Sequence, residues 1–277
     1  MVQTLKMAVA QPLCRPGDIS GNLGRMESMV AQAAREGARL VLFAEGGVTG
    51  YRKDFPSVTI GDEVCRRLAA MAGACDIVVA AGFMEQDGDA RHLSHGVFFP
   101  DGRLLVQRKA RPGPPEGDMP DWRPGPDERR VFEVDGVRCA ISICADTGIP
   151  GLWNTLARQG VQVHLIPTAG VGPRSWGFSE AALDEPSVLE AAVKKAESMC
   201  FSGDAIRECR RHRMVMASCN QMADNGSDYF HPGHSMIVDT TGELTALIPG
   251  VCIFEHLRER LACGVVHPQV PREVPAA

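Results

Sequence analysis

The sequence predicts an α/β protein in which helices cover the faces of a mixed β-sheet. Short apolar runs alternate with amphipathic segments in the first third of the chain, in the order β-α-β-α-β. Hairpin signals follow at Asp101-Gly102 and Asp135-Gly136, and a second β-α-β unit comes after them. The run RLVLFA at 39–44 is continuously apolar, which is typical of a strand covered on both faces.

The expected strands are apolar or β-branched runs that end at proline, glycine or a polar residue. They lie at 6–11, 39–44, 77–83, 95–100, 103–109, 131–134, 138–143, 161–167, 214–220, 234–238 and 243–247. The expected helices carry apolar residues three and four positions apart. They lie at 22–36, 62–72, 151–159, 187–199 and 203–213. The segment 110–130 is rich in proline and glycine, so we expect a long loop of the kind that carries function or lacks structure.

Composition excludes several classes of protein. The chain has 277 residues, 44% of them hydrophobic and 23% charged, which is ordinary for a soluble globular protein. A net charge of −5 argues against a nucleic-acid partner, which would need a basic face. We find neither a membrane-spanning run nor a signal peptide and expect a cytoplasmic protein. We expect one domain over 1–277, with 267–277 as an extended C-terminal arm.

The cysteines and histidines do not form a metal-binding pattern. Ten cysteines are spaced irregularly without a C-x-x-C, so we expect most of them to be reduced core residues. Two H-x-x-H pairs, at 92/95 and 231/234, have no cysteine or glutamate nearby at ligand spacing. We therefore expect no metal and no other cofactor.

Three chemically active side chains each follow an apolar strand: Glu45, Lys109 and Cys144. Strand ends can converge on one side of a sheet. A thiol with a pKa of about 8.5 is mostly protonated at neutral pH and needs a base or a cation beside it. Taken alone, the segment around Cys144 favours an ordinary core cysteine, because free cysteine is among the most buried residue types. The combination of the three favours a nucleophile.

The segments around these residues resemble the motifs of the nitrilase, or carbon–nitrogen hydrolase, superfamily. That family carries F-P-E-x-x-x-T-G-Y, and 43–51 reads FAEGGVTGY. It carries Y-R-K-x-H-L, and 107–111 reads QRKAR. It carries I-C-x-D-x-x-x-P, and 143–150 reads ICADTGIP. The opening strand KMAVAQP and the late strand GHSMIVDTTGE also match, so the resemblance runs in order from about Lys6 to Glu243.

The chain departs from the family pattern at several positions. Ala44 replaces the usual proline, and 110–111 reads Ala-Arg in place of x-His. Ala145 stands where an aromatic residue is common, and Gly151 where a glutamate is common. A cysteine and four basic residues at 209–213 replace a helix end that reads Ala-Arg-Ala-x-Glu-Asn in the family. These changes are compatible with the chemistry, but they do not allow the chain to be assigned to a subfamily.

The resemblance implies a four-layer α-β-β-α sandwich of two mixed sheets with the helices outside. It also implies a homodimer or a higher homo-oligomer. Glu45 would act as general base for Cys144, while Lys109 and the Ala145 N–H would hold the oxyanion. A second glutamate usually completes the family's site, and Glu116 is the candidate, with Asp118 as its fallback.

Aromatic residues near these segments are candidates for the wall of a substrate pocket. We expect Trp176, Tyr51 and Trp122 there, although an ordinary packed aromatic explains Trp176 equally well. Arg174 is a candidate partner for a substrate carboxylate, but arginines in loops are mostly solvated.

The sequence therefore predicts hydrolysis of a non-peptide C–N bond in a small amide or N-carbamoyl amide, through a thioester and with release of ammonia or an amine. An acyltransferase or a nitrilase on the same site is an alternative. A nitrilase-fold binding module without catalysis is another. A thiol redox protein is disfavoured, because Cys139 lies back along the same strand as Cys144.

Overall fold

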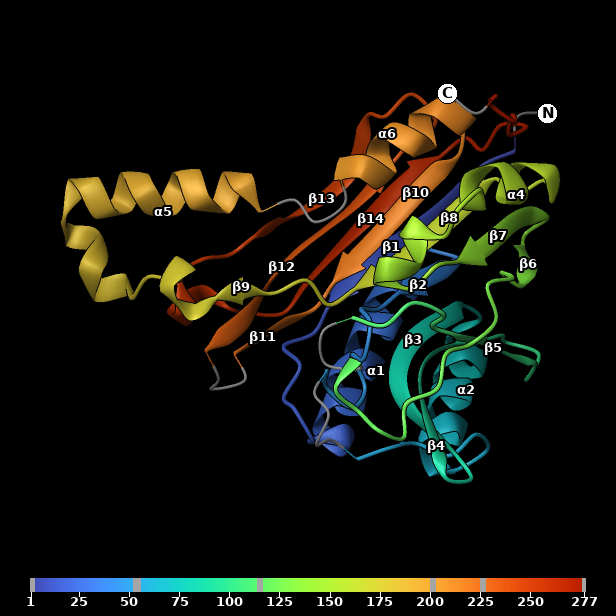
Figure 1. Ribbon diagram of the computed structural model, residues 1–277, viewed down its shortest axis with the longest axis horizontal. Coiled ribbons are helices and arrows are strands. Elements are labelled where there is room, and N and C mark those ends of the chain that lie inside the picture. Colours follow the sequence, from blue (N-terminus) through green and yellow to red (C-terminus); the bar gives the residue numbers. More distant parts are fainter. Residues whose placement is uncertain (1–2, 52–55, 114–116, 200–202, 225–227, 276–277) are drawn as a thin grey trace.

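The computed structural model describes residues 3–51, 56–113, 117–199, 203–224 and 228–275. Two β-sheets lie face to face, and helices cover their outer surfaces (Figure 1). This four-layer α-β-β-α arrangement confirms the predicted fold class.

The first sheet has six strands in the order β14-β1-β2-β3-β4-β5. Their bounds are β1 Leu5–Gln11, β2 Leu40–Leu42, β3 Val78–Asp87, β4 Ala90–Phe98, β5 Leu104–Arg108 and β14 Arg260–Val266. The pairs β1/β2 and β2/β3 are parallel, and the other pairs are antiparallel. The sheet is therefore mixed.

The second sheet has eight strands, with β11-β12-β10-β8-β7-β6 in order and β13 and β9 paired to β12. Their bounds are β6 Val131–Val134, β7 Val137–Ile141, β8 Val163–Thr168, β9 Gly172–Pro173, β10 Val215–Asn220, β11 Met222–Asp224, β12 Tyr229–Val238 and β13 Leu244–Gly250. The central strands β7, β8 and β10 run parallel, so their carboxyl ends lie at one edge.

Apolar side chains fill the three interfaces between the layers. Residues of both sheets, such as Met7, Leu42 and Leu165, form the central core. The helices α1 (Ile19–Arg35) and α2 (Glu63–Cys75) pack on the first sheet. The helices α4 (Leu152–Arg158) and α6 (Gly203–His212) pack on the second. Burial of apolar surface in these layers is the main force that stabilises the fold.

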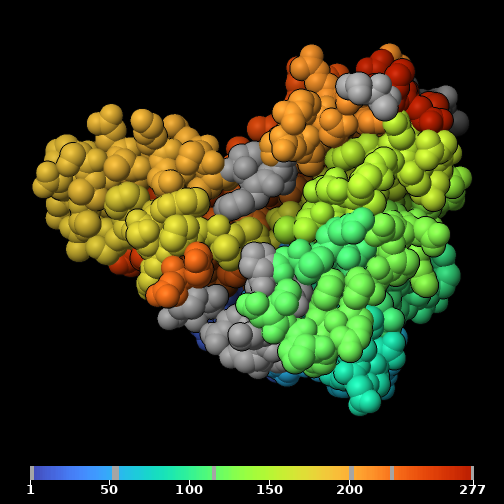
Figure 2. Space-filling model, viewed as in Figure 1, coloured from blue at the N-terminus to red at the C-terminus, as the bar shows by residue number. Residues whose placement is uncertain are grey.

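The helix α5 (Pro186–Ser198) extends beyond the sheets and forms a lobe at one end of the molecule (Figures 1 and 2). It packs through a separate apolar cluster that includes Ala192, Met199 and Phe230. In the described parts of the chain, no helix is both long and apolar enough to cross a bilayer.

Several element boundaries differ from the sequence prediction. The helix α1 begins at Ile19 rather than 22, because the Asp18 side chain accepts the Gly21 N–H at 2.9 Å and caps the helix. β3 continues to Asp87, which pairs with Ala90 across a tight turn. β14 was not predicted, because Gly264 reads as a strand breaker. A Cβ at that glycine would lie 2.8 Å from Thr245 Oγ1, so the glycine allows β13 to approach closely.

The C-terminal arm is bonded to the outer helices of its own chain. Val274 exchanges two hydrogen bonds of 2.8 Å with the Asn154 side chain on α4. The N–H of Arg272 donates to the His212 carbonyl at the end of α6, at 3.0 Å. The described part of the arm, up to residue 275, has no helix or strand.

We predict that His164 makes the fold sensitive to acid. This β8 residue is fully buried against Trp153, and none of the described residues hydrogen-bonds its ring nitrogens. Burial lowers the pKa of His164 to about 3, so below pH 6.5 the unfolded chain binds a proton that the folded chain does not. Stability is therefore lost as the pH falls. The variant His164→Phe lacks this titrating group. Between pH 6 and 4, its unfolding free energy should fall by up to about 1.4 kcal/mol less per pH unit than that of the wild type. Urea unfolding at several pH values measures this difference. Parallel curves of unfolding free energy against pH for the two proteins would contradict the prediction.

Candidate active site

Glu45 and Lys109 form a buried ion pair between the ends of two strands. Glu45 follows β2 and Lys109 follows β5, and Lys109 Nζ lies 2.6 Å from Glu45 Oε1. Both side chains are fully buried. Lys109 Nζ also donates to the Tyr51 hydroxyl at 3.3 Å. A single charge buried at this depth would be costly, so each charge depends on the other.

Cys144 lies beside this pair. β7 ends at Ile141, and Cys144 opens a short 3₁₀ turn, Cys144–Gly148. Its φ of +48° is in the left-handed region, which non-glycine residues seldom adopt. The Glu45 carboxylate and the backbone N–H of Ala169 lie close enough to the thiol to shift its pKa. The structure thus brings together the three residues that the sequence singled out.

The environment of Cys144 disfavours the thiolate in the resting protein. Burial raises the pKa of the Cys144 thiol to about 12, and the Glu45 carboxylate adds to this effect. Lys109 and the N–H of Ala169 act in the opposite direction. The thiol is therefore protonated at neutral pH, with the Glu45 carboxylate beside it as proton acceptor.

Asp146 joins the segment that carries the lysine to the segment that carries the cysteine. Its Oδ1 accepts the N–H groups of Ala110 and Arg111, each at 2.9 Å. Its Oδ2 accepts the Ile143 N–H at 3.2 Å and is bonded by Arg129 at 2.7 Å. Burial raises the pKa of Asp146, and Arg129 opposes that shift. The sequence analysis quoted this aspartate in its motif but assigned it no role.

Among the other predicted site residues, Ala145 and Tyr51 lie with this group and Trp176 does not. Ala145 is half-buried in the turn after the cysteine, and its oxyanion role remains a prediction. Trp176 packs in the cluster below α5, with Lys195 Nζ 4.0 Å from the ring centroid. Its place in a substrate pocket also remains a prediction. Glu116 lies outside the described residues, and the fallback Asp118 is exposed.

Arg174 has an ion-pair partner in the structure. Its guanidinium bonds Asp224 at 2.5 and 3.1 Å and lies over the Phe254 ring. Trp122 lies in the long loop and packs against the central core. The ion pair satisfies the charge of Arg174 without a ligand, whereas the buried Nε1 of Trp122 has no hydrogen-bond partner among the described residues.

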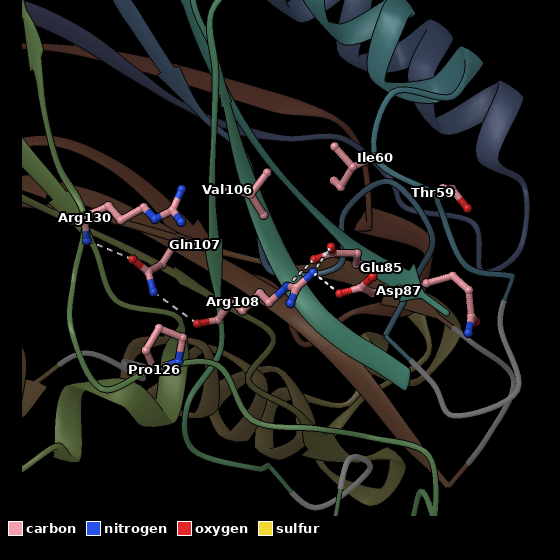
Figure 3. A pocket seen from close by; sticks show the side chains of 10 residues that line it. Thr59, Ile60, Glu85, Asp87, Val106, Gln107, Arg108, Pro126 and Arg130 are labelled. Atoms are coloured by element: carbon pink, nitrogen blue, oxygen red, sulfur yellow. Dashed lines mark hydrogen bonds and ion pairs between the residues drawn. The ribbon is translucent and has the colours of Figure 1, made fainter. Parts of the chain in front are cut away.

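A separate pocket of about 520 Å³ opens at the free edge of the first sheet, beside β5 (Figure 3). Arg108 bonds the Glu85 carboxylate at 2.5 and 3.0 Å and reaches Asp87 at 2.7 Å. Ser94 donates to the same Glu85 carboxylate at 2.5 Å. These charges are compensated within the wall, and the ion pair and thiol described above do not line this pocket.

The fold and the site together define a class: a four-layer α/β protein that holds a thiol, a carboxylate and an ammonium group together at strand ends. The chain belongs to the carbon-nitrogen hydrolase family, whose model matches residues 6–250. This confirms the resemblance seen in the sequence motifs.

Known proteins of this kind are similar over most of the chain. A citrullinase of Francisella tularensis is 29% identical over 87% of this chain and 84% of its own length. An omega-amidase of Xenopus tropicalis is 26% identical over 82% of this chain and 78% of its own. Nitrilase 3 of Arabidopsis thaliana is 24% identical over 75% of this chain, but the match spans only 63% of that nitrilase.

Solved structures show the same fold. A mutant of the amidase from Nesterenkonia sp. AN1, in complex with butyramide, superposes with a TM-score of 0.72. The two chains are 20% identical, and the match covers 95% of this chain and 91% of that one. Another mutant of that amidase shows covalent addition of the acetamide moiety of fluoroacetamide at its active site cysteine.

We predict that the Asp146–Arg129 pair stabilises the protein as a unit. Both side chains are at most 1% exposed, so Asp146→Ala leaves a buried guanidinium without its carboxylate and should cost about 3–5 kcal/mol of unfolding free energy. Arg129→Met should cost a similar amount, and the double variant less than the sum. Urea unfolding measures all three.

The exposed Arg66–Glu63 pair provides the matched control. Its side chains are 65% and 72% exposed, so Arg66→Ala should cost less than about 1 kcal/mol. Strict additivity of the Asp146 and Arg129 substitutions would contradict the prediction.

Proposed function

We propose that this protein hydrolyses a non-peptide C–N bond in a small amide or N-carbamoyl amide, with Cys144 as nucleophile. The observation that carries the proposal is the meeting of Cys144 with the fully buried Glu45–Lys109 pair. The curated relatives support the substrate class, because they include an omega-amidase and a citrullinase. The butyramide complex of the structurally similar amidase supports a small amide.

The first half of the proposed reaction forms a thioester. Glu45 takes the proton of Cys144 as the sulfur attacks the carbonyl carbon. The ammonium of Lys109 and the N–H of Ala145 stabilise the oxyanion of the tetrahedral intermediate. As the intermediate collapses, Glu45 passes its proton to the leaving nitrogen, and ammonia or an amine departs.

The second half releases the acid. Glu45 takes a proton from a water molecule that attacks the thioester carbon, and the same donors hold the second oxyanion. Collapse breaks the C–S bond, and the proton returns from Glu45 to the departing thiolate. A carboxylate in the long loop, proposed as Glu116, would position the substrate or the water.

We predict that Cys144→Ala abolishes ammonia release from every accepted amide, because the covalent route is lost. The rate should fall by several orders of magnitude. Screening amides, N-carbamoyl amines, ureido acids and nitriles by ammonia release identifies the substrate and measures the loss. Cys75→Ser is the matched control, since Cys75 is a half-buried thiol at the end of α2 and should be replaceable without effect. Substantial activity in Cys144→Ala would contradict the mechanism.

The same assay separates the proposal from its alternatives. An acyltransferase would transfer the acyl group to an added amine in preference to water, so the product shows which acceptor is used. A binding module would release no ammonia from any compound of the screen.

A further inference from the structure

Ala169 lies beside Cys144 although it is far from it in sequence. It directly follows β8, which pairs in parallel with β7, the strand before the cysteine. Its backbone N–H is close enough to lower the pKa of the Cys144 thiol. The next residue, Gly170, is bonded by side chains at both its backbone N–H and its carbonyl. Its N–H donates to Asn220 Oδ1 at 2.7 Å, and its carbonyl lies 3.3 Å from His231 Nδ1.

Asn220 is held between two neighbouring strands of the second sheet. It ends β10 and is fully buried. Its Oδ1 also accepts the hydroxyl of Thr168 on β8 at 3.0 Å, and its Nδ2 donates to the Gly233 carbonyl on β12. Since one amide side chain uses its donor and its acceptor here, a smaller or purely apolar residue leaves the Gly170 N–H without this partner.

His231 connects the same Ala169–Gly170 segment to the ion pair. It lies on β12 and is 2% exposed, and burial lowers its pKa to about 4, so its ring is neutral at pH 7. A carbonyl only accepts, so Nδ1 carries the ring hydrogen and donates it to Gly170. The ring meets Tyr51 edge to face, at 6.3 Å between centroids. The hydroxyl of Tyr51 in turn accepts a hydrogen bond from Lys109.

We infer that Asn220 and His231 are positioning residues that hold the Ala169–Gly170 segment so that the Ala169 N–H stabilises the Cys144 sulfur when it becomes a thiolate. The inference rests on the proposed function, in which that thiolate attacks the substrate. The N–H donor is separate from Ala145, which faces the oxyanion in the proposed mechanism. Hydrogen bonds to an ionised acceptor are stronger than those to a neutral one, so the Ala169 N–H favours the charged sulfur over the resting thiol.

The test measures thiolate formation directly. Iodoacetamide alkylation of Cys144, followed by intact mass and peptide mapping between pH 6 and 10, reports the thiolate without any amide substrate. His231→Phe keeps an aromatic ring against Tyr51 but removes the donor to Gly170. It should slow alkylation about tenfold at pH 7.5, move the pH profile upward and lower kcat by a similar factor, with KM within about twofold.

Two further variants separate positioning from general destabilisation. Asn220→Ser shortens the side chain that accepts the Gly170 N–H, and we expect the same upward shift of the pH profile. His231→Asn places an amide N–H near the position of Nδ1 and should restore most of the alkylation rate. His234→Asn is the matched control on the same strand, because His234 Nδ1 bonds the Gly250 N–H instead. It should behave as the wild type.

The outcomes distinguish this inference from the proposed function. A wild-type protein that neither alkylates at Cys144 nor releases ammonia refutes the proposed function. A wild type that does both, with His231→Phe and Asn220→Ser unchanged in rate and pH profile, refutes the positioning role alone. An unfolded variant exposes all of its thiols and is recognised by multiple adducts. Loss of the fold in both variants would also overturn the inference, because it would make the two residues structural.

Discussion

The buried ion pair between Glu45 and Lys109 is the interaction on which the site depends. Neither charge is stable alone at zero exposure, and at 2.6 Å each makes the other possible. Cys144 lies beside the carboxylate. When its proton moves to Glu45, a carboxylate–ammonium pair becomes a thiolate–ammonium pair, and the number of buried charges stays the same. The proton transfer therefore adds no net buried charge, although burial still disfavours the thiolate.

The residue patterns predicted helices on a mixed sheet and singled out three central side chains, and the resemblance to the family implied the four-layer sandwich. Glu45, Lys109 and Cys144 each follow an apolar run, and a reactive side chain at a strand end is a local signal that needs no knowledge of partners. The family motifs then indicated that the three belong together. Most strands were also found, because the two faces of each sheet are buried and the runs read as continuously apolar.

The supporting residues could not be predicted in this way. The carboxylate of Asp146 joins segments 36 residues apart, and Asn220 and His231 bond Gly170, which is 50 and 61 residues away from them. Such partners depend on which strands become neighbours, and local sequence patterns carry no information about that. β14 was missed for a related reason, since Gly264 is favourable only where β13 approaches it. The long loop was recognised as irregular, but Glu116 within it lies outside the described residues.

The most direct measurement is the mass of the protein quenched during turnover of an accepted amide. The account predicts an added acyl group, mapped to the peptide that contains Cys144 and lost on further incubation with water. Turnover with no acyl adduct on Cys144, or with the adduct on another residue, would contradict the account.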